Sequence, residues 1–254
     1  MEPEGTAACE FLKWDSAFFR VRIARVLGRR MDAQRAAAVE AWRRAERIRC
    51  VYFLAELSDA AGIRAAEDNG FRMVDVRLTY GRAVPAPGLQ EVESAAFRIR
   101  AARPEDLPCL EEIAGSSYHE SRFYSDPHFP RADCAALYQT WIRRSCCEGF
   151  AEAVFVAERA GEATGYISCH LEKGGAASGR IGLLGVASQA RGEGLGPSLL
   201  AAALAWFGAQ QVAEVSLVTQ GRNLAAQRLY QRCGFLVQAA GVWFHKWHET
   251  EGRP

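Results

Sequence analysis

The hydrophobic pattern of the chain alternates between strand-like and helix-like segments. Apolar residues that alternate with polar ones, or form short continuous runs, predict strands at Phe97–Arg103, Ala153–Glu158, Gly165–His170, Ile181–Val186, Glu214–Thr219 and Val242–Trp247. One-sided apolar patterns or an opening proline predict helices from Pro104, over 132–148, over Pro197–Gln210 and over Leu224–Cys233. This alternation of strands and helices predicts an α/β (α+β) fold.

The N-terminal part repeats the order of the last third of the chain. A strand (50–57), a helix (59–69), the pair Gly70-Phe71 and a strand (72–80) match the strand–helix–Gly-Phe–strand order of residues 214–247. Aligning the two Gly-Phe pairs places Ala66 at the position of Tyr230, and the first copy has no glycine-rich loop before its helix. We interpret it as a degenerate half-repeat that completes the fold and shapes an acceptor site. Chance similarity of two common βαβ fragments is the alternative.

Composition limits the domain count and the compartment. The Pro- and Gly-rich start of segment 83–96 predicts a linker, which divides an N-terminal domain (1–82) from a C-terminal domain (97–254). A net charge of +1 gives no general attraction to nucleic acid or membranes, and no apolar run approaches the roughly 20 residues of a membrane span. The start of the chain is acidic and lacks a signal-peptide pattern, so we expect a cytoplasmic protein.

Cysteine and histidine spacing does not predict a metal site. The eight cysteines form no C-x-x-C pair, which favours reduced thiols that behave as small hydrophobic residues. His245 and His248 stand close together but have no third ligand nearby in the sequence, and the end of a terminal strand is the simpler interpretation. We therefore expect no metal.

The run Gln189–Gly196 lies between a predicted strand and a predicted helix and contains three glycines. Unpaired N–H groups at a helix N-terminus favour a phosphate, and glycines let the backbone approach it closely. A P-loop is excluded because Pro197-Ser198, and not Lys-Ser or Lys-Thr, follows the last glycine. The G-x-G-x-G spacing also disagrees with a dinucleotide fingerprint. A tight turn without a ligand is the remaining alternative.

The residues Gln189 to Gly194 match the Q/R-x-x-G-x-G/A pattern of the GNAT acetyltransferase superfamily, and Asn223, Tyr230 and Gly234-Phe235 follow in that family's order. The resemblance covers residues 97–247. It implies a GNAT fold in the C-terminal domain, with a central mixed, twisted sheet flanked by helices, and a smaller, degenerate GNAT-like domain before it. It also implies acetyl-CoA as co-substrate, with its pyrophosphate on residues 191–196. The cofactor-binding residues implied are Leu184, Gly185, Val186, Gln189, Arg191, Gly192, Glu193, Gly194, Leu195, Gly196 and Asn223.

Further motifs resemble a subgroup of the GNAT family that acetylates amino sugars carried on a nucleotide diphosphate. Residues 12–19, which contain Trp14, resemble the subgroup's W-[ED]-x-x-F-F opening, and Ser121-Arg122-Phe123 is a second matching segment. The resemblance implies an N-acetyltransferase for a sugar of the dTDP-4-amino-dideoxyhexose type. A GNAT enzyme for another small-molecule or peptide amine, and a non-catalytic acyl-CoA-binding sensor, are the alternatives. The oligomeric state, a homodimer included, stays open.

Acetyl transfer to an amine needs a base, donors for the oxyanion and an acid for the departing thiolate. By the resemblance, Tyr230 takes the position of the general acid; a core aromatic is the alternative. Asp75 falls where the subgroup carries a glutamate proposed as base, and its pKa would have to rise through burial; a solvated strand residue is the alternative. The oxyanion donors implied are backbone amides of 184–186, splayed by a bulge that Gly185 would ease. Asn223 would hold the pantetheine arm or the tyrosine, or cap the following helix.

The acceptor site depends on three side chains. Arg122 could form forked hydrogen bonds with a diphosphate. Phe123 and Trp14 could stack on a base or sugar, although core packing is the stronger interpretation for each of these aromatic residues taken alone.

Overall fold

The computed structural model describes residues 8–84, 97–172 and 178–248, and the strands of these ranges form one ten-stranded sheet. In sheet order they are β1 (Cys9–Phe11), β2 (Ile23–Val26), β3 (Cys50–Glu56), β10 (Leu236–Trp247), β4 (Arg72–Ala83), β9 (Glu214–Gln220), β8 (Ser178–Val186), β7 (Glu162–Leu171), β6 (Ala153–Arg159) and β5 (Arg98–Ala101). The α-helices are α1 (Lys13–Phe19), α2 (Ala33–Ala45), α3 (Ala60–Asp68), α4 (Leu107–Gly115), α5 (Arg122–Ser125), α6 (Arg131–Cys147), α7 (Leu195–Ala209) and α8 (Leu224–Arg232). The mixed sheet with its flanking helices confirms the predicted fold class.

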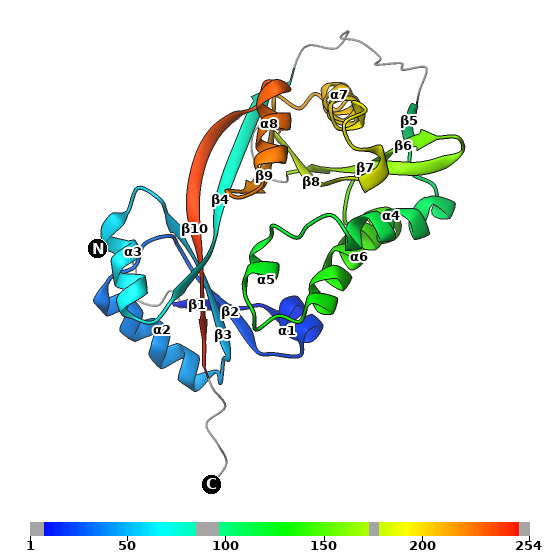
Figure 1. Ribbon diagram of the computed structural model, residues 1–254. Coiled ribbons are helices and arrows are strands. Elements are labelled where there is room, and N and C mark those ends of the chain that lie inside the picture. Colours follow the sequence, from blue (N-terminus) through cyan, green and yellow to red (C-terminus); the bar gives the residue numbers. More distant parts are fainter. Residues whose placement is uncertain (1–7, 85–96, 173–177, 249–254) are drawn as a thin grey trace.

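The last strand of each half of the chain pairs with strands of the other half. β10 pairs with β3 on one side and β4 on the other, both antiparallel, and β4 in turn pairs with β9. The order β3-β10-β4-β9 therefore places two strands of the N-terminal part and two of the C-terminal part alternately. Figure 1 shows the long strands β4 and β10 running side by side through the middle of the molecule.

The two copies of the half-repeat agree in local geometry. Asp59 and Asn223 occupy the N-cap positions of α3 and α8, and each side chain accepts a hydrogen bond from the backbone N–H three residues later. Each helix is followed by a glycine with positive φ, +78° at Gly70 and +77° at Gly234, and then by a buried phenylalanine. A residue with a side chain is strained at such φ values, which explains why glycine stands at both positions.

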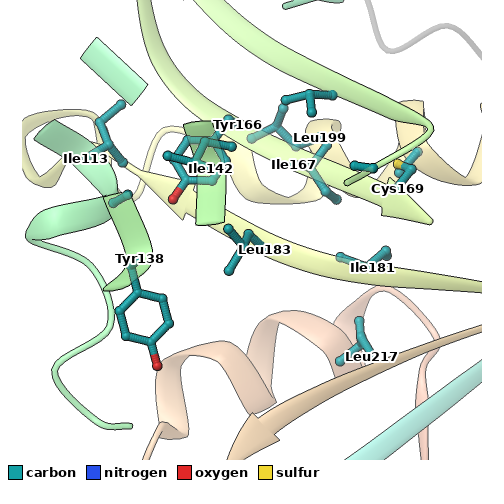
Figure 2. Close-up of a cluster of buried hydrophobic side chains, with 14 of the residues drawn as sticks. Ile113, Tyr138, Ile142, Tyr166, Ile167, Cys169, Ile181, Leu183, Leu199 and Leu217 are labelled. Carbon is teal, nitrogen blue, oxygen red and sulfur yellow. The ribbon is translucent and has the colours of Figure 1, made fainter. Parts of the chain in front are cut away.

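Helices cover both faces of the sheet and complete two hydrophobic cores. α4 and α7 both pack on β7, and Figure 2 shows Ile113, Tyr166, Ile167 and Leu199 within one buried hydrophobic cluster. The smaller core lies between α2, α3 and the strands β2, β3 and β10. Figure 1 shows α2 and α3 together at the end of the sheet opposite α7.

Some expected elements differ in extent. β10 begins at Leu236, six residues before the predicted start at Val242. The prediction missed the first part of the strand because this part is exposed and lacks an apolar pattern. The chain at Pro104 first makes a 3₁₀ turn over Pro104–Asp106, and α4 follows it. The predicted linker 83–96 falls almost entirely outside the described residues; Ala83 is the last residue of β4, and Val84 follows it. The division into domains 1–82 and 97–254 stays a prediction.

In the described ranges, no helix combines the length and the apolar composition that a membrane crossing requires. Residues 8–84, 97–172 and 178–248 contain no group of three or more His, Cys, Asp or Glu side chains placed to hold a metal ion.

Candidate active site

A wedge opens between the parallel strands β8 and β9. They are paired only from Ser178 to Ile181 on β8, opposite residues 214–217, although both strands continue. β8 stays bound to β7 as far as Val186, and β9 stays bound to β4 as far as Gln220, so the two strands diverge while each keeps its outer neighbour. The inner backbone edge of β8 beyond Ile181 is therefore free to hydrogen-bond a ligand.

The glycine-rich loop lies between the end of β8 and the N-terminus of α7. Gly192 and Gly194 have φ of +84° and +87°, and a Cβ at either position would meet nothing within 4 Å. Gly194 is the N-cap of α7, and no side chain caps the helix there. The first-turn amides of a helix have no partner within the helix and carry partial positive charge. The loop thus offers an open site for an anionic group.

The other loop residues support this backbone or face solvent. Exposed Arg191 donates a hydrogen bond from Nε to the Val186 carbonyl at 3.2 Å, which ties the loop to β8. Glu193 forms an ion pair with Arg159 at 2.5 Å, so its carboxylate is already partnered. Both side chains hold the loop in place, while its backbone remains available.

Leu195, Gly196 and Gln189 have different surroundings. Leu195 is buried and anchors the first turn of α7, and Gly196 lies against Leu229 of α8, whose methyl carbon would be 3.0 Å from an added Cβ. Gln189 is exposed on the 3₁₀ turn Ser188–Ala190. A side chain at position 196 would therefore require the Leu229 side chain to shift by a few tenths of an ångström.

A bulge was expected at 184–186, but the structure has it about two residues earlier on β8. The strand pairing at 184–186 is regular, and the irregularity falls at Gly182–Leu183, where the Leu183 N–H donates to Ser168 Oγ at 2.8 Å. Gly185 has another function: its missing Cβ would lie 2.9 Å from the ring of Tyr166. The wedge therefore comes from the early end of the β8–β9 pairing.

Tyr230 lies on α8, 7% exposed, with the rings of Tyr80 and Phe235 at 5.8 and 6.3 Å between centroids. Burial and the neighbouring Tyr80 raise the pKa of its phenol well above 10, which keeps the group protonated at neutral pH. Asn223 positions the helix, since its Oδ1 accepts from the Ala226 N–H at 3.0 Å. In this structure the Asn223 side chain therefore caps the N-terminus of α8.

Two further tyrosines, which sequence reasoning missed, lie close to the same region. The Tyr118 and Tyr166 hydroxyls are 3.0 Å apart, and the Tyr118 ring stacks on Tyr138 at 4.3 Å. Burial raises the pKa of Tyr118 well above its usual value, and the adjacent Tyr166 and Tyr230 add to the effect. Tyr118 is therefore near enough to Tyr230 for their hydroxyls to interact electrostatically.

Asp75 lies on β4, directly opposite Trp243, and is 2% exposed. Its Oδ1 has no hydrogen-bond partner, and the Arg222 Nε is 4.0 Å away. Burial raises the pKa of this carboxyl from 3.8 to about 6, with Arg222 acting in the opposite direction. Asp75 is not the solvated residue of the alternative interpretation; its carboxyl can exchange a proton near neutral pH.

Arg122, the first residue of α5, lies in a box of aromatic rings. Its guanidinium carbon is 4.2 Å from the centroids of Tyr52 and Phe123 and 4.5 Å from that of Trp243. It donates a hydrogen bond to His245 Nε2 at 2.8 Å. No carboxylate in the described ranges forms an ion pair with it, so its positive charge is not neutralised by direct contact.

The two predicted aromatic ligands are largely used in packing. Phe123 is 3% exposed and stacks on Phe19 at 5.4 Å between centroids. Trp14 of α1 is partly buried and stacks on Phe18 at 5.2 Å. Of the predicted acceptor residues, Arg122 is the charged one, and its guanidinium can donate forked hydrogen bonds to an anion.

A second cation strengthens the positive charge on this side of the sheet. Half-buried Arg77 of β4 has a buried Nε without a hydrogen-bond partner. Burial lowers the pKa of its guanidinium, and the neighbouring Arg29, Arg122 and Arg180 lower it further. The accumulation of arginines suits an anionic ligand.

A sheet that splays between two parallel strands, with a glycine loop and an uncapped helix N-terminus at the opening, defines an acyl-CoA-dependent acyltransferase of the GNAT class. Residues 114–235 match the acetyltransferase (GNAT) family, and the chain carries a domain of this family. The solved GCN5-related N-acetyltransferase from Sphaerobacter thermophilus superposes with a TM-score of 0.62 at 20% identity. The superposition covers 84% of this chain and 67% of the Sphaerobacter chain.

Two curated relatives match at higher identity. The dTDP-fucosamine acetyltransferase of Escherichia coli O6:H1 is 26% identical over 242 residues, which are 94% of this chain and 98% of that protein. The spore coat polysaccharide biosynthesis protein SpsD of Bacillus subtilis is 28% identical over 174 residues, 66% of this chain, and the match spans 56% of SpsD.

Proposed function

We propose that this acetyltransferase moves an acetyl group from acetyl-CoA to the amine of a nucleotide-linked amino sugar, of the dTDP-4-amino-dideoxyhexose type. The observation that carries the proposal is the similarity to the dTDP-fucosamine acetyltransferase, which extends over both halves of the chain and beyond the GNAT-matched residues. The arginines beside the candidate base give independent support, because a nucleotide diphosphate is strongly anionic.

Acetyl-CoA fits the wedge. The open amides of 191–196 suit its pyrophosphate, and the free edge of β8 suits the amide groups of its pantetheine arm. When bound, it supplies the thioester carbonyl that the amine attacks. Within residues 184–186, the backbone N–H groups that point away from β7 are the donors for the oxyanion that develops there.

The two titratable side chains have complementary states. Asp75, with a pKa of about 6, is mostly ionised at pH 7 and can take the proton of the amine. Tyr230 is protonated at that pH and can donate to the departing thiolate. The direction of both pKa shifts favours a base and an acid in these assignments.

In the acceptor site, Arg122 binds the diphosphate, and Arg77 adds positive charge. Because Phe123 and Trp14 are packed in the core, their contribution to substrate binding is to hold Arg122 and α1 in place.

The test is acetyl transfer by the purified chain to a panel of dTDP-linked amino sugars, polyamines and peptide N-termini. The N-acetylated product should be detected by mass spectrometry, since the exposed thiol of Cys147 would react with thiol reagents. Turnover confined to the nucleotide sugars is expected. Turnover confined to polyamines or peptides would reject the proposed acceptor, and acetyl-CoA binding without any turnover would identify a sensor.

A further inference from the structure

A buried hydrogen-bond network connects β10 to the loop after α5. His245 Nδ1 and Trp247 Nε1 both contact Asp126 Oδ2, at 2.6 and 2.7 Å. The second carboxylate oxygen of Asp126 contacts the backbone N–H and ring Nδ1 of His128, at 3.0 and 2.8 Å. His245 and Asp126 are 1% and 3% exposed, so this is a polar network inside the protein.

The network fixes which nitrogen of His245 carries the proton. Burial alone would raise the pKa of Asp126, but the hydrogen bonds that it accepts lower this pKa well below its usual range, so Asp126 is a carboxylate and accepts from His245 Nδ1–H. Burial lowers the pKa of His245 to about 4, and the ring is therefore neutral at pH 7. A neutral imidazole with a proton on Nδ1 has a free acceptor at Nε2. That atom faces the Arg122 guanidinium at 2.8 Å.

The aromatic box completes the restraint. His245 itself stacks on Tyr52, with ring centroids 4.5 Å apart, and the guanidinium of Arg122 lies over the same Tyr52 ring. Arg122 is thus held by a neutral acceptor and by ring faces. A carboxylate in direct contact would neutralise its charge, whereas a neutral imidazole orients the group and leaves the charge for another anion.

We infer that Asp126 and His245 are positioning residues that orient Arg122 as the anion-binding group of the acceptor site, with a diphosphate as its ligand. The inference rests on the proposed function for the identity of the acceptor. Trp247 gives the carboxylate a second donor and thereby keeps Oδ2 fixed relative to His245.

Calorimetric titration of the purified chain with dTDP tests this without turnover. Arg122→Gln should weaken binding tenfold or more, and His245→Gln about three- to tenfold, because the arginine stays but loses its orientation. His128→Gln is the matched control: it removes a histidine from the other oxygen of Asp126, is more than half exposed, and should change the affinity less than twofold. No binding of dTDP by the wild-type chain, or equal binding by His245→Gln, would overturn the inference.

Kinetics supply a readout that a purely structural role would not move. His245→Gln should raise KM for a dTDP-linked amino sugar while kcat and the KM for the same amino sugar without the nucleotide stay within twofold. Equal increases for both acceptors would overturn the positioning role. If circular dichroism shows that His245→Gln does not fold, Arg122→Lys provides the test in its place. This variant keeps the positive charge but loses the forked hydrogen-bond donors of the guanidinium, so an unchanged dTDP affinity would refute oriented binding.

The outcomes separate this inference from the proposed function. Binding of dTDP that depends on His245, without acetylation of any nucleotide sugar, rejects the proposed function alone. Acetylation of nucleotide sugars with a KM that is indifferent to Arg122 and His245 rejects the inference alone.

Discussion

Asp75→Asn should abolish most of the activity and at the same time stabilise the fold. The wild-type carboxyl has a pKa of about 6 instead of 3.8 because it is buried with one oxygen unpartnered. At about 1.4 kcal/mol per pKa unit, keeping it ionised at pH 7 costs the folded state roughly 3 kcal/mol. An amide carries no such cost, whereas the loss of a general base reduces rate by about 10²- to 10⁴-fold.

The raised pKa of Asp75 predicts opposite pH trends for activity and for stability. A base must be ionised, so kcat/KM of the wild type should be level above pH 7 and fall below pH 6, by about tenfold at pH 5. With an ordinary aspartate the loss at pH 5 would be under about 10%. The stability difference has the opposite trend. The folded pKa lies above the unfolded one, so the wild type gains stability as the pH falls from 7 to 4, and the advantage of Asp75→Asn disappears over that window.

Product formation from pH 5 to 8 and urea unfolding at pH 4.5 and 7 measure the two effects. Exposed Asp68→Asn is the control and should leave rate and stability unchanged within about 0.5 kcal/mol. Arg222→Gln should move the acidic limb upward by at most about half a pH unit, because its half-exposed side chain is well screened. An Asp75→Asn variant that keeps the wild-type rate, or one less stable than wild type at pH 7, would refute this reasoning.

Three other changes test the remaining parts. Tyr230→Phe should lower kcat about 10²-fold and leave the KM for acetyl-CoA within threefold, measured by initial rates; an unchanged kcat would remove it as the acid. Gly194→Val forces a β-branched residue to a φ of +87° and displaces the open amides, so the Kd for coenzyme A from calorimetry should rise at least tenfold. The pKa of His245, about 4 folded against roughly 6.5 unfolded, predicts up to about 3 kcal/mol lost between pH 6.5 and 4. Urea unfolding at pH 7.5 and 5 should show a smaller loss for His245→Gln, and an equal loss would contradict the assignment.

The sequence pattern was most informative where structure is local. The strands and helices around the glycine loop have clear periodicity, and Tyr230 and Asn223 stand at fixed distances from a recognisable Gly-Phe pair. α1, β1 and β2 were missed because they are three to seven residues long, too short for a period to show. α2 was missed because its alanines and arginines form only a weak apolar face.

The parts of the site that could not be predicted depend on distant partners. Asp126 meets His245 across 119 residues of chain, and Tyr118 meets Tyr166 across 48. The sequence contains no spacing that links such pairs. Likewise, the position of β10 between β3 and β4 follows from strand pairing, which hydrophobic patterns leave undetermined.

The exchange of β4 and β10 has a consequence for synthesis on the ribosome. β3 and β4 are synthesised early, yet they do not pair with each other in the finished sheet, because β10 lies between them. A nascent chain must therefore keep two bare strand edges apart until residues 236–247 emerge, and such edges readily join foreign strands. Translation pauses or binding of a chaperone between α3 and β10 should affect the yield of folded protein more than pauses elsewhere.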